Sequence, residues 1–145
     1  MAKRLPRIVL DTNVLLVSVS RRSSLYWLYE SFLQGRFKLC VSTEVLAEYA
    51  EILDRHMGPA FCDQTLEVIT MAANTRYISP TYRFHLLQDP DDNKFVDCAI
   101  AANAVCIVSH DRDFLPLRLI EFPKVAVVDT IRFREVLNEA IGIFE

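Results

Sequence analysis

The sequence predicts an α/β fold in which a central, mainly parallel sheet is covered by helices on both faces. Short apolar runs rich in Val and Ile alternate along the chain with longer segments of helical periodicity. These runs lack a polar alternation, which is typical of strands buried on both faces. The 145 residues are 52% hydrophobic with only 3 Gly and 6 Pro, which predicts one compact domain, residues 1–145, with a substantial core.

The predicted elements follow one another as strand and helix. The strands are expected at residues 7–11, 37–41, 77–78, 105–108 and 125–128. The helices are expected at residues 13–20, 25–34, 43–55, 63–74, 93–103 and 130–141. Gly35 is expected to end the second helix, Ser42 and Thr43 to cap the third, and Asp63 to cap the fourth. Residues 80–88 are expected to form a loop.

Composition excludes several classes of protein. The formal net charge of −3 gives no global reason to bind nucleic acid, although clustered acids can mask a local basic rim. No apolar run approaches the roughly 20 residues of a membrane span, and Pro6 interrupts the N-terminus too early for a signal peptide. The four scattered cysteines form no CxxC pair, so we expect reduced core thiols in a cytoplasmic protein.

Acidic residues follow the predicted strands at several places. Asp11 ends the first strand, and the helix after the second strand carries Glu44 and Glu48. The run "DPDDNKF" opens the helix before the third long strand, and "VSHDRDF" follows that strand. Because the carboxyl ends of parallel strands meet at one edge, where open α/β sheets place their chemistry, we expect these carboxylates to converge there.

Each acid also has an ordinary structural explanation. Asp11 lies where a helix N-cap would lie. The run Asp89-Pro90-Asp91-Asp92 is a near-ideal helix start, with Asp at the N-cap, Pro at N1 and two acids in the first turn. Asp111 or Asp113 alone could be a turn residue. These alternatives remain open for each acid taken singly.

The acids as a set are harder to explain by helix capping. Glu48 has no cation three or four residues away, and it borders the apolar face of its helix, where an unpaired carboxylate is costly. Converging carboxylates repel each other unless a cation joins them, and oxygen-only ligands favour Mg²⁺ or Mn²⁺. His56, His85 and His110 are isolated, so neither zinc nor a Ser-His-Asp triad is supported.

Four stretches carry a resemblance to a known family: "VLDTNVLL", "STEVLAEYAEIL", "DPDDNKFVDCAIAANA" and "IVSHDRDFL". In this order, they resemble the PIN domain, the fold of many metal-dependent ribonucleases, including VapC-type toxins of toxin–antitoxin pairs. The resemblance covers nearly the whole chain. It implies a three-layer α/β/α PIN-like domain with a central, mainly parallel sheet.

The resemblance also implies a set of catalytic residues that bind one or two Mg²⁺ or Mn²⁺ ions. These residues are Asp11, Glu48, Asp92 and Asp111. Asn13 falls where a small polar residue often supports the first Asp. Ser109 replaces the usual Thr before the last acid, and Asn103 replaces a frequent Gly, but neither change removes a ligand. The alternative or additional ligands are Asp89, Asp91 and Asp113.

The activity implied by the resemblance is that of an endoribonuclease, a hydrolase of RNA phosphodiester bonds. Its expected partners are RNA, a small cognate antitoxin protein and a second copy of the chain. The cations expected at the rim of the substrate site are Arg21, Arg22, Lys94, Arg112 and Arg118. The alternative is a catalytically inactive PIN-fold module that binds protein, which the retention of all four acids disfavours. A phosphotransfer protein fits poorly, because Asn13 stands where the phosphatase pattern needs a second Asp.

Overall fold

The computed structural model describes residues 4–142 and the side chains of residues 4–140. Five strands form one sheet in the order β3-β2-β1-β4-β5, and every neighbouring pair is parallel. The strands are β1 (Arg7–Leu10), β2 (Lys38–Val41), β3 (Thr75–Tyr77), β4 (Cys106–Val108) and β5 (Val127–Val128). In the centre, Ile8 of β1 pairs with Leu39 on one side and Cys106 on the other. The predicted parallel α/β sheet is confirmed.

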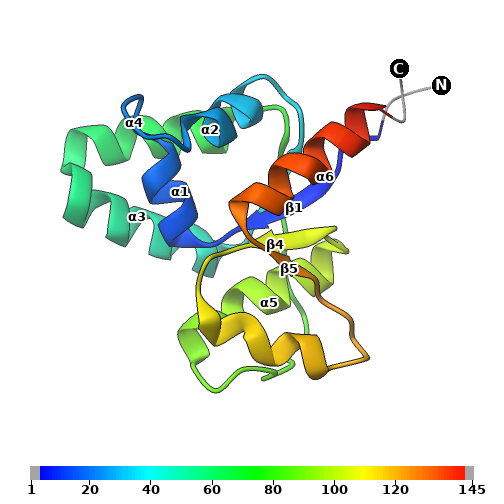
Figure 1. Ribbon diagram of the computed structural model, residues 1–145. Helices are drawn as coiled ribbons and strands as arrows, with labels where there is room; N and C mark the ends of the chain where they lie inside the picture. The colour runs from blue at the N-terminus through cyan, green and yellow to red at the C-terminus, as the bar shows by residue number, and fades with distance from the viewer. Residues whose placement is uncertain (1–3, 143–145) are drawn as a thin grey trace.

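Helices cover both faces of the sheet (Figure 1). They are α1 (Thr12–Ser18), α2 (Tyr26–Leu33), α3 (Thr43–Met57), α4 (Pro59–Met71), α5 (Pro90–Ala102), the 3₁₀ helix η1 (Arg112–Leu119) and α6 (Thr130–Gly142). In Figure 1, α5 lies below the sheet and α6 lies above it. Phe133 of α6 contacts Trp27 of α2 and Phe37, with ring centroids 6.2 and 5.3 Å away. These aromatic contacts close the upper layer over the sheet.

Helix α4 begins earlier than predicted. Its first residue is Pro59 and its N-cap is Gly58, so the expected cap at Asp63 is wrong and Asp63 lies inside the helix. Gly58 has a φ of +83°, a value that a residue without a side chain adopts easily, and it ends α3 as it starts α4. Pro59 at N1 has its φ already fixed for a helix. The two helices therefore form a tight hairpin.

The C-terminal part of the sheet also departs from the prediction. The strand expected at residues 125–128 pairs only over Val127–Val128, opposite Ile107 and Val108 of β4. Residues 112–119, for which no element was predicted, form η1. Pro116 within η1 has no N–H to donate, which suits a short and irregular helix better than an α-helix.

The core contains the cysteines, as the sequence predicts. All four cysteines are buried and free. Burial raises the pKa of Cys98 and Cys106 to about 12, which makes both thiols poor nucleophiles. Among the helices within residues 4–142, none combines the length and apolar character that a bilayer crossing requires.

Candidate metal centre

The strand order reverses between β1 and β4, because β2 and β3 extend the sheet on one side of β1 while β4 and β5 extend it on the other. Crevices at the carboxyl ends of strands at such a switch point are where α/β folds bind ligands. Asp11 directly follows β1, and its backbone N–H donates to the carbonyl of Val108 at the end of β4, at 3.0 Å. We call the four acids Asp11, Glu48, Asp92 and Asp111 the acidic edge.

Asp11 occupies the N-cap position of α1 without capping it. Its side chain makes no cap hydrogen bond and instead accepts from the hydroxyl of Ser109 at 2.8 Å. It is only 7% exposed. Burial raises the pKa of Asp11; the hydrogen bond from Ser109 opposes this, and the charges of Asp111 and Glu48 add to the increase. The ordinary explanation of Asp11 as a cap therefore does not hold.

Glu48 reaches the edge because α3 is anchored to β1. The hydroxyl of Tyr49 donates to the carbonyl of Leu10 at 2.6 Å, a fully buried bond worth about 1 kcal/mol. Glu48 Oε2 then accepts from the hydroxyl of Thr12. Its Oε1 lies 3.0 Å from Lys94 Nζ, so the absence of a cation on its own helix is offset by one from α5. The negative charge of Glu48 is thus balanced by Lys94, which the sequence did not reveal.

Asp92 lies in the first turn of α5 with one oxygen unsatisfied. Oδ2 is buried and has no hydrogen-bond partner among the described residues. The pKa of Asp92 is raised to about 6, first by burial and then by the charges of Asp89, Asp111, Asp113 and Asp11. A buried carboxylate oxygen without a donor is costly unless a ligand completes it.

The other acids of this run have different surroundings. Asp89 is the N-cap of α5 and accepts from the backbone N–H of Asp91 at 2.9 Å. The side chain of Asp91 is 81% exposed and lies 3.9 Å from Lys94. Asp111 caps η1 by accepting from the N–H of Asp113 at 2.9 Å. Helix capping therefore accounts for the position of Asp89. In Asp111 capping uses only Oδ1, so the other carboxylate oxygen is not used by the cap.

The residues present suit a hard divalent cation. In residues 4–140 no three His, Cys, Asp or Glu side chains stand close enough to surround one ion as they are. Mg²⁺, however, keeps several waters and is commonly bound by one or two carboxylates together with substrate phosphates. Asp92 has a buried oxygen without a hydrogen-bond partner, and the side chain of Asp11 caps no helix. Both carboxylates are metal ligands of that kind.

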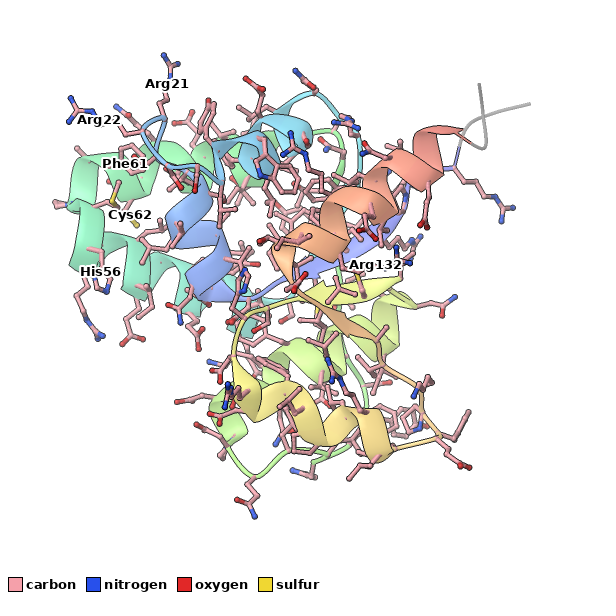
Figure 2. The ribbon with its side chains drawn as sticks, in the orientation of Figure 1. Arg21, Arg22, His56, Phe61, Cys62 and Arg132 are labelled. Carbon is pink, nitrogen blue, oxygen red and sulfur yellow. The ribbon has the colours of Figure 1, made fainter. Side chains whose placement is uncertain are left out.

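The five cations expected at the rim fall into three groups. Lys94 is paired with Glu48 and is largely buried, with a side chain 15% exposed, so it is not the exposed rim cation that the sequence predicts. Arg21 and Arg22 follow the C-terminus of α1 and line a separate groove with apolar residues of α2 and α4 (Figure 2). Arg112 and Arg118 line a cleft that begins at Asp111.

Several positioning residues were not singled out from sequence. Thr12 holds Glu48, while Asn13 is exposed and makes no hydrogen bond to Asp11 within residues 4–140, contrary to the support expected of it. Asn93 both accepts from and donates to the backbone of Leu87, and buried Asp97 accepts from the N–H of Phe84 at 3.1 Å. These bonds dock the loop before α5. Their only sequence signal is a polar residue on the apolar face of the helix.

The family follows from the sequence once this geometry is in place. The family model described as PIN domain matches residues 7–113, a span that includes all four acids of the edge. The chain belongs to the PIN domain family. Curated proteins yield no sequence match at a significant level.

Solved structures show the same PIN fold at low sequence identity. VapBC2 from Rickettsia felis, bound to a DNA fragment from its promoter, is 17% identical with a TM-score of 0.61, covering 85% of this chain and 98% of that one. VapC20 from Mycobacterium tuberculosis, a toxin that cleaves the sarcin–ricin loop, is 15% identical with a TM-score of 0.56, covering 74% and 92%. The PIN domain endonuclease Utp24 is 16% identical with a TM-score of 0.51, covering 86% and 84%.

Proposed function

We propose that this PIN domain is a metal-dependent endoribonuclease whose catalytic residues are Asp11, Glu48, Asp92 and Asp111. The observation that carries the proposal is the state of Asp92 and Asp11: neither carboxylate forms an ion pair within residues 4–140, and Asp92 Oδ2 has no donor. Mg²⁺ or Mn²⁺ fits this all-oxygen set best. Bound there, such an ion supplies the Lewis acidity that activates water and offsets charge on a phosphodiester.

Each residue of the acidic edge would contribute to binding that ion in a different way. Asp11 is oriented by Ser109, which also accepts from the backbone N–H of Asp111 at 2.9 Å, so one hydroxyl fixes the distance between two acids. Asp92 contributes the buried oxygen. Glu48 is held by Thr12 and Lys94, and as a ligand it would exchange its contact with Lys94. Lys94 is then placed to balance the negative charge of the acidic edge that the metal ion does not offset.

An RNA cleavage assay tests this proposal. The purified protein should cut RNA with Mn²⁺ or Mg²⁺, and EDTA should stop it. Asp11→Asn should lower the rate on the order of 10²–10³-fold, as removal of one preorganised charge-stabilising group does. Asp63→Asn removes the same charge from an exposed position of α4 and should leave the rate unchanged. Full activity of Asp11→Asn in a nuclease-free preparation would disprove the assignment.

We further propose that the protein is the toxin of a toxin–antitoxin pair and that a small antitoxin protein is its partner. Two structures of the same fold are VapBC assemblies, from Rickettsia felis and Salmonella typhimurium. Induced expression of the wild type should arrest bacterial growth, whereas Asp11→Asn should not. Arrest by both proteins would point to a cause other than catalysis.

The family resemblance also supports a homodimer. Light scattering of the purified protein should give twice the mass of the 16.7 kDa chain. A monomer at all concentrations that the assay uses would contradict this proposal without affecting the catalytic one.

A further inference from the structure

A cleft of about 340 Å³ opens beside the acidic edge, between η1, the ends of β4 and β5, and the first turn of α6. It begins at Ser109, His110 and Asp111, so it adjoins the candidate metal centre. Figure 2 labels Arg132 at the α6 side of this region. Most of its other lining residues follow Asp113, where the PIN family match ends. We call it the arginine cleft.

The charged residues that line the arginine cleft are three arginines and two aspartates. Arg112, Arg118 and Arg132 line it, against Asp111 and Asp129. Arg132 is already committed, with ion pairs to Glu135 at 2.8 Å and Glu139 at 3.0 Å. Arg112 and Arg118, both exposed, form no ion pair or side-chain hydrogen bond with any residue in 4–140. Two guanidinium groups are therefore available to an anionic ligand.

Arg112 also connects this cleft to the acids. It lines a second hollow, of about 440 Å³, together with Asp89, Asp92 and Asp113. An anion bound at Arg112 would thus lie between the acidic edge and the arginine cleft. The cleft is also lined by the aliphatic side chains of Leu115, Val127 and Val128 and by buried Phe114. Aliphatic side chains next to two exposed arginines suit a group that is flat and apolar in one part and anionic in another.

We infer that the arginine cleft binds the nucleotide next to the cleaved phosphate of a single-stranded RNA. Arg112 and Arg118 bind its phosphate oxygens, and the aliphatic side chains that line the cleft contact its base. The inference rests on the proposed ribonuclease function and assigns residues to one subsite of its substrate. A volume of about 340 Å³ is of the size that small ligands occupy. An unpaired base can enter such a cleft without breaking a base pair, so a single strand is favoured over a duplex.

Binding measurements with a matched pair of double variants test this inference. In an Asp11→Asn background with Ca²⁺, fluorescence anisotropy would follow a short labelled single-stranded RNA. Arg112→Gln/Arg118→Gln should weaken binding about tenfold and lower the slope of log K against log salt by about one. Arg21→Gln/Arg22→Gln removes the same charge from two arginines on the other groove, which are also exposed and form no ion pair within residues 4–140. It should change affinity less than about twofold, as expected for distant screened charges.

Two further measurements complete the test. The same RNA in a perfect duplex should bind the Asp11→Asn parent more weakly and lose little affinity on Arg112→Gln/Arg118→Gln. Thermal melts should show that both double variants fold like the parent. Equal losses for the two double variants, or no loss for Arg112→Gln/Arg118→Gln, would overturn the inference.

The outcome remains separate from that of the catalytic proposal. If the wild type cleaves RNA while Arg112→Gln/Arg118→Gln binds normally, the cleft assignment fails and the ribonuclease proposal stands. If no metal supports cleavage, yet the same double variant loses single-strand binding selectively, the ribonuclease proposal fails and the cleft stands as an RNA site. If the parent binds no RNA, the cleft assignment fails.

Discussion

Glu44 and Glu48 lie one helical turn apart on α3 and have opposite surroundings. Glu44 is exposed and accepts a hydrogen bond from Arg83 at 2.7 Å, which lowers its pKa below the usual value. Glu48 is largely buried and is held by Thr12 and Lys94 at the acidic edge. The same contrast recurs elsewhere: Glu51 and Glu135 on outer helix faces pair with exposed arginines, whereas Asp11 and Asp92 form no ion pair within residues 4–140.

The difference shows where the fold tolerates unfavourable charge. Exposed pairs such as Glu51–Arg55 contribute little to stability, because water screens both partners. Buried carboxylates without a cation destabilise the folded chain unless a ligand is bound. Concentrating that cost at the switch point of the sheet is expected of a binding site rather than of a structural surface.

The largest expected effect separates the two glutamates. Glu48→Gln should reduce metal-dependent RNA cleavage on the order of 10²–10³-fold, since it removes a charge from the edge. Glu44→Gln should reduce it modestly at most, because Glu44 pairs with exposed Arg83. Both rates would be measured under single-turnover conditions with Mn²⁺. The reverse pattern would place the catalytic acid one turn earlier on α3.

Metal-linked stability is the next largest effect. A hundredfold excess of Mn²⁺ over its Kd should stabilise the wild type by about 2.7 kcal/mol, raising Tm by roughly 10 °C. Asp92→Asn should gain much less, because the unsatisfied Oδ2 is lost. Thermal melts with EDTA and with Mn²⁺ compare the two proteins. An equal gain in both would show that Asp92 only begins the helix, and the ligand would then be sought at Asp91 or Asp89.

The pH dependence of metal-free stability should be smaller. The folded pKa of Asp92, about 6, exceeds the ordinary value of 3.8, so the folded state binds more protons between these two values. Stability should therefore fall as pH rises from about 4 to about 6, by about 1–2 kcal/mol after solvent screening, and then level off. Asp92→Asn should lack this fall and be at least as stable as wild type at pH 7. Urea titrations with EDTA at pH 4.5 and pH 7 measure the difference.

The smallest expected effect on stability and cleavage is that of a substitution on the outer surface. Glu51→Gln should change the free energy of unfolding by less than about 0.5 kcal/mol, since Glu51 and Arg55 are an exposed i,i+4 pair at 2.9 Å. It should also leave cleavage and the response to Mn²⁺ unchanged. A larger loss in urea titration would mean that outer charges matter as much as those at the edge.

Much of this molecule was determined by local sequence alone. Apolar runs predicted the strands, helical spacing on α3 and α5 predicted their buried faces, and parallel pairing then brought Asp11, Asp92 and Asp111 to one edge of the sheet. These features could be predicted because periodicity and strand direction are set by neighbouring residues. Turn chemistry was less informative: Gly58-Pro59, rather than Asp63, starts α4.

Only the tertiary structure decided which acids are paired with a cation or a hydrogen-bond donor. Lys94 lies 46 residues from Glu48, and Ser109 lies 98 residues from Asp11, so neither contact has a local signal. The same holds for Arg112 and Arg118, which line a cleft beside the acids, whereas Arg21 and Arg22 line a different groove. The physical reason is that the charge state of a carboxylate depends on burial and on partners brought close by packing, and sequence spacing describes neither.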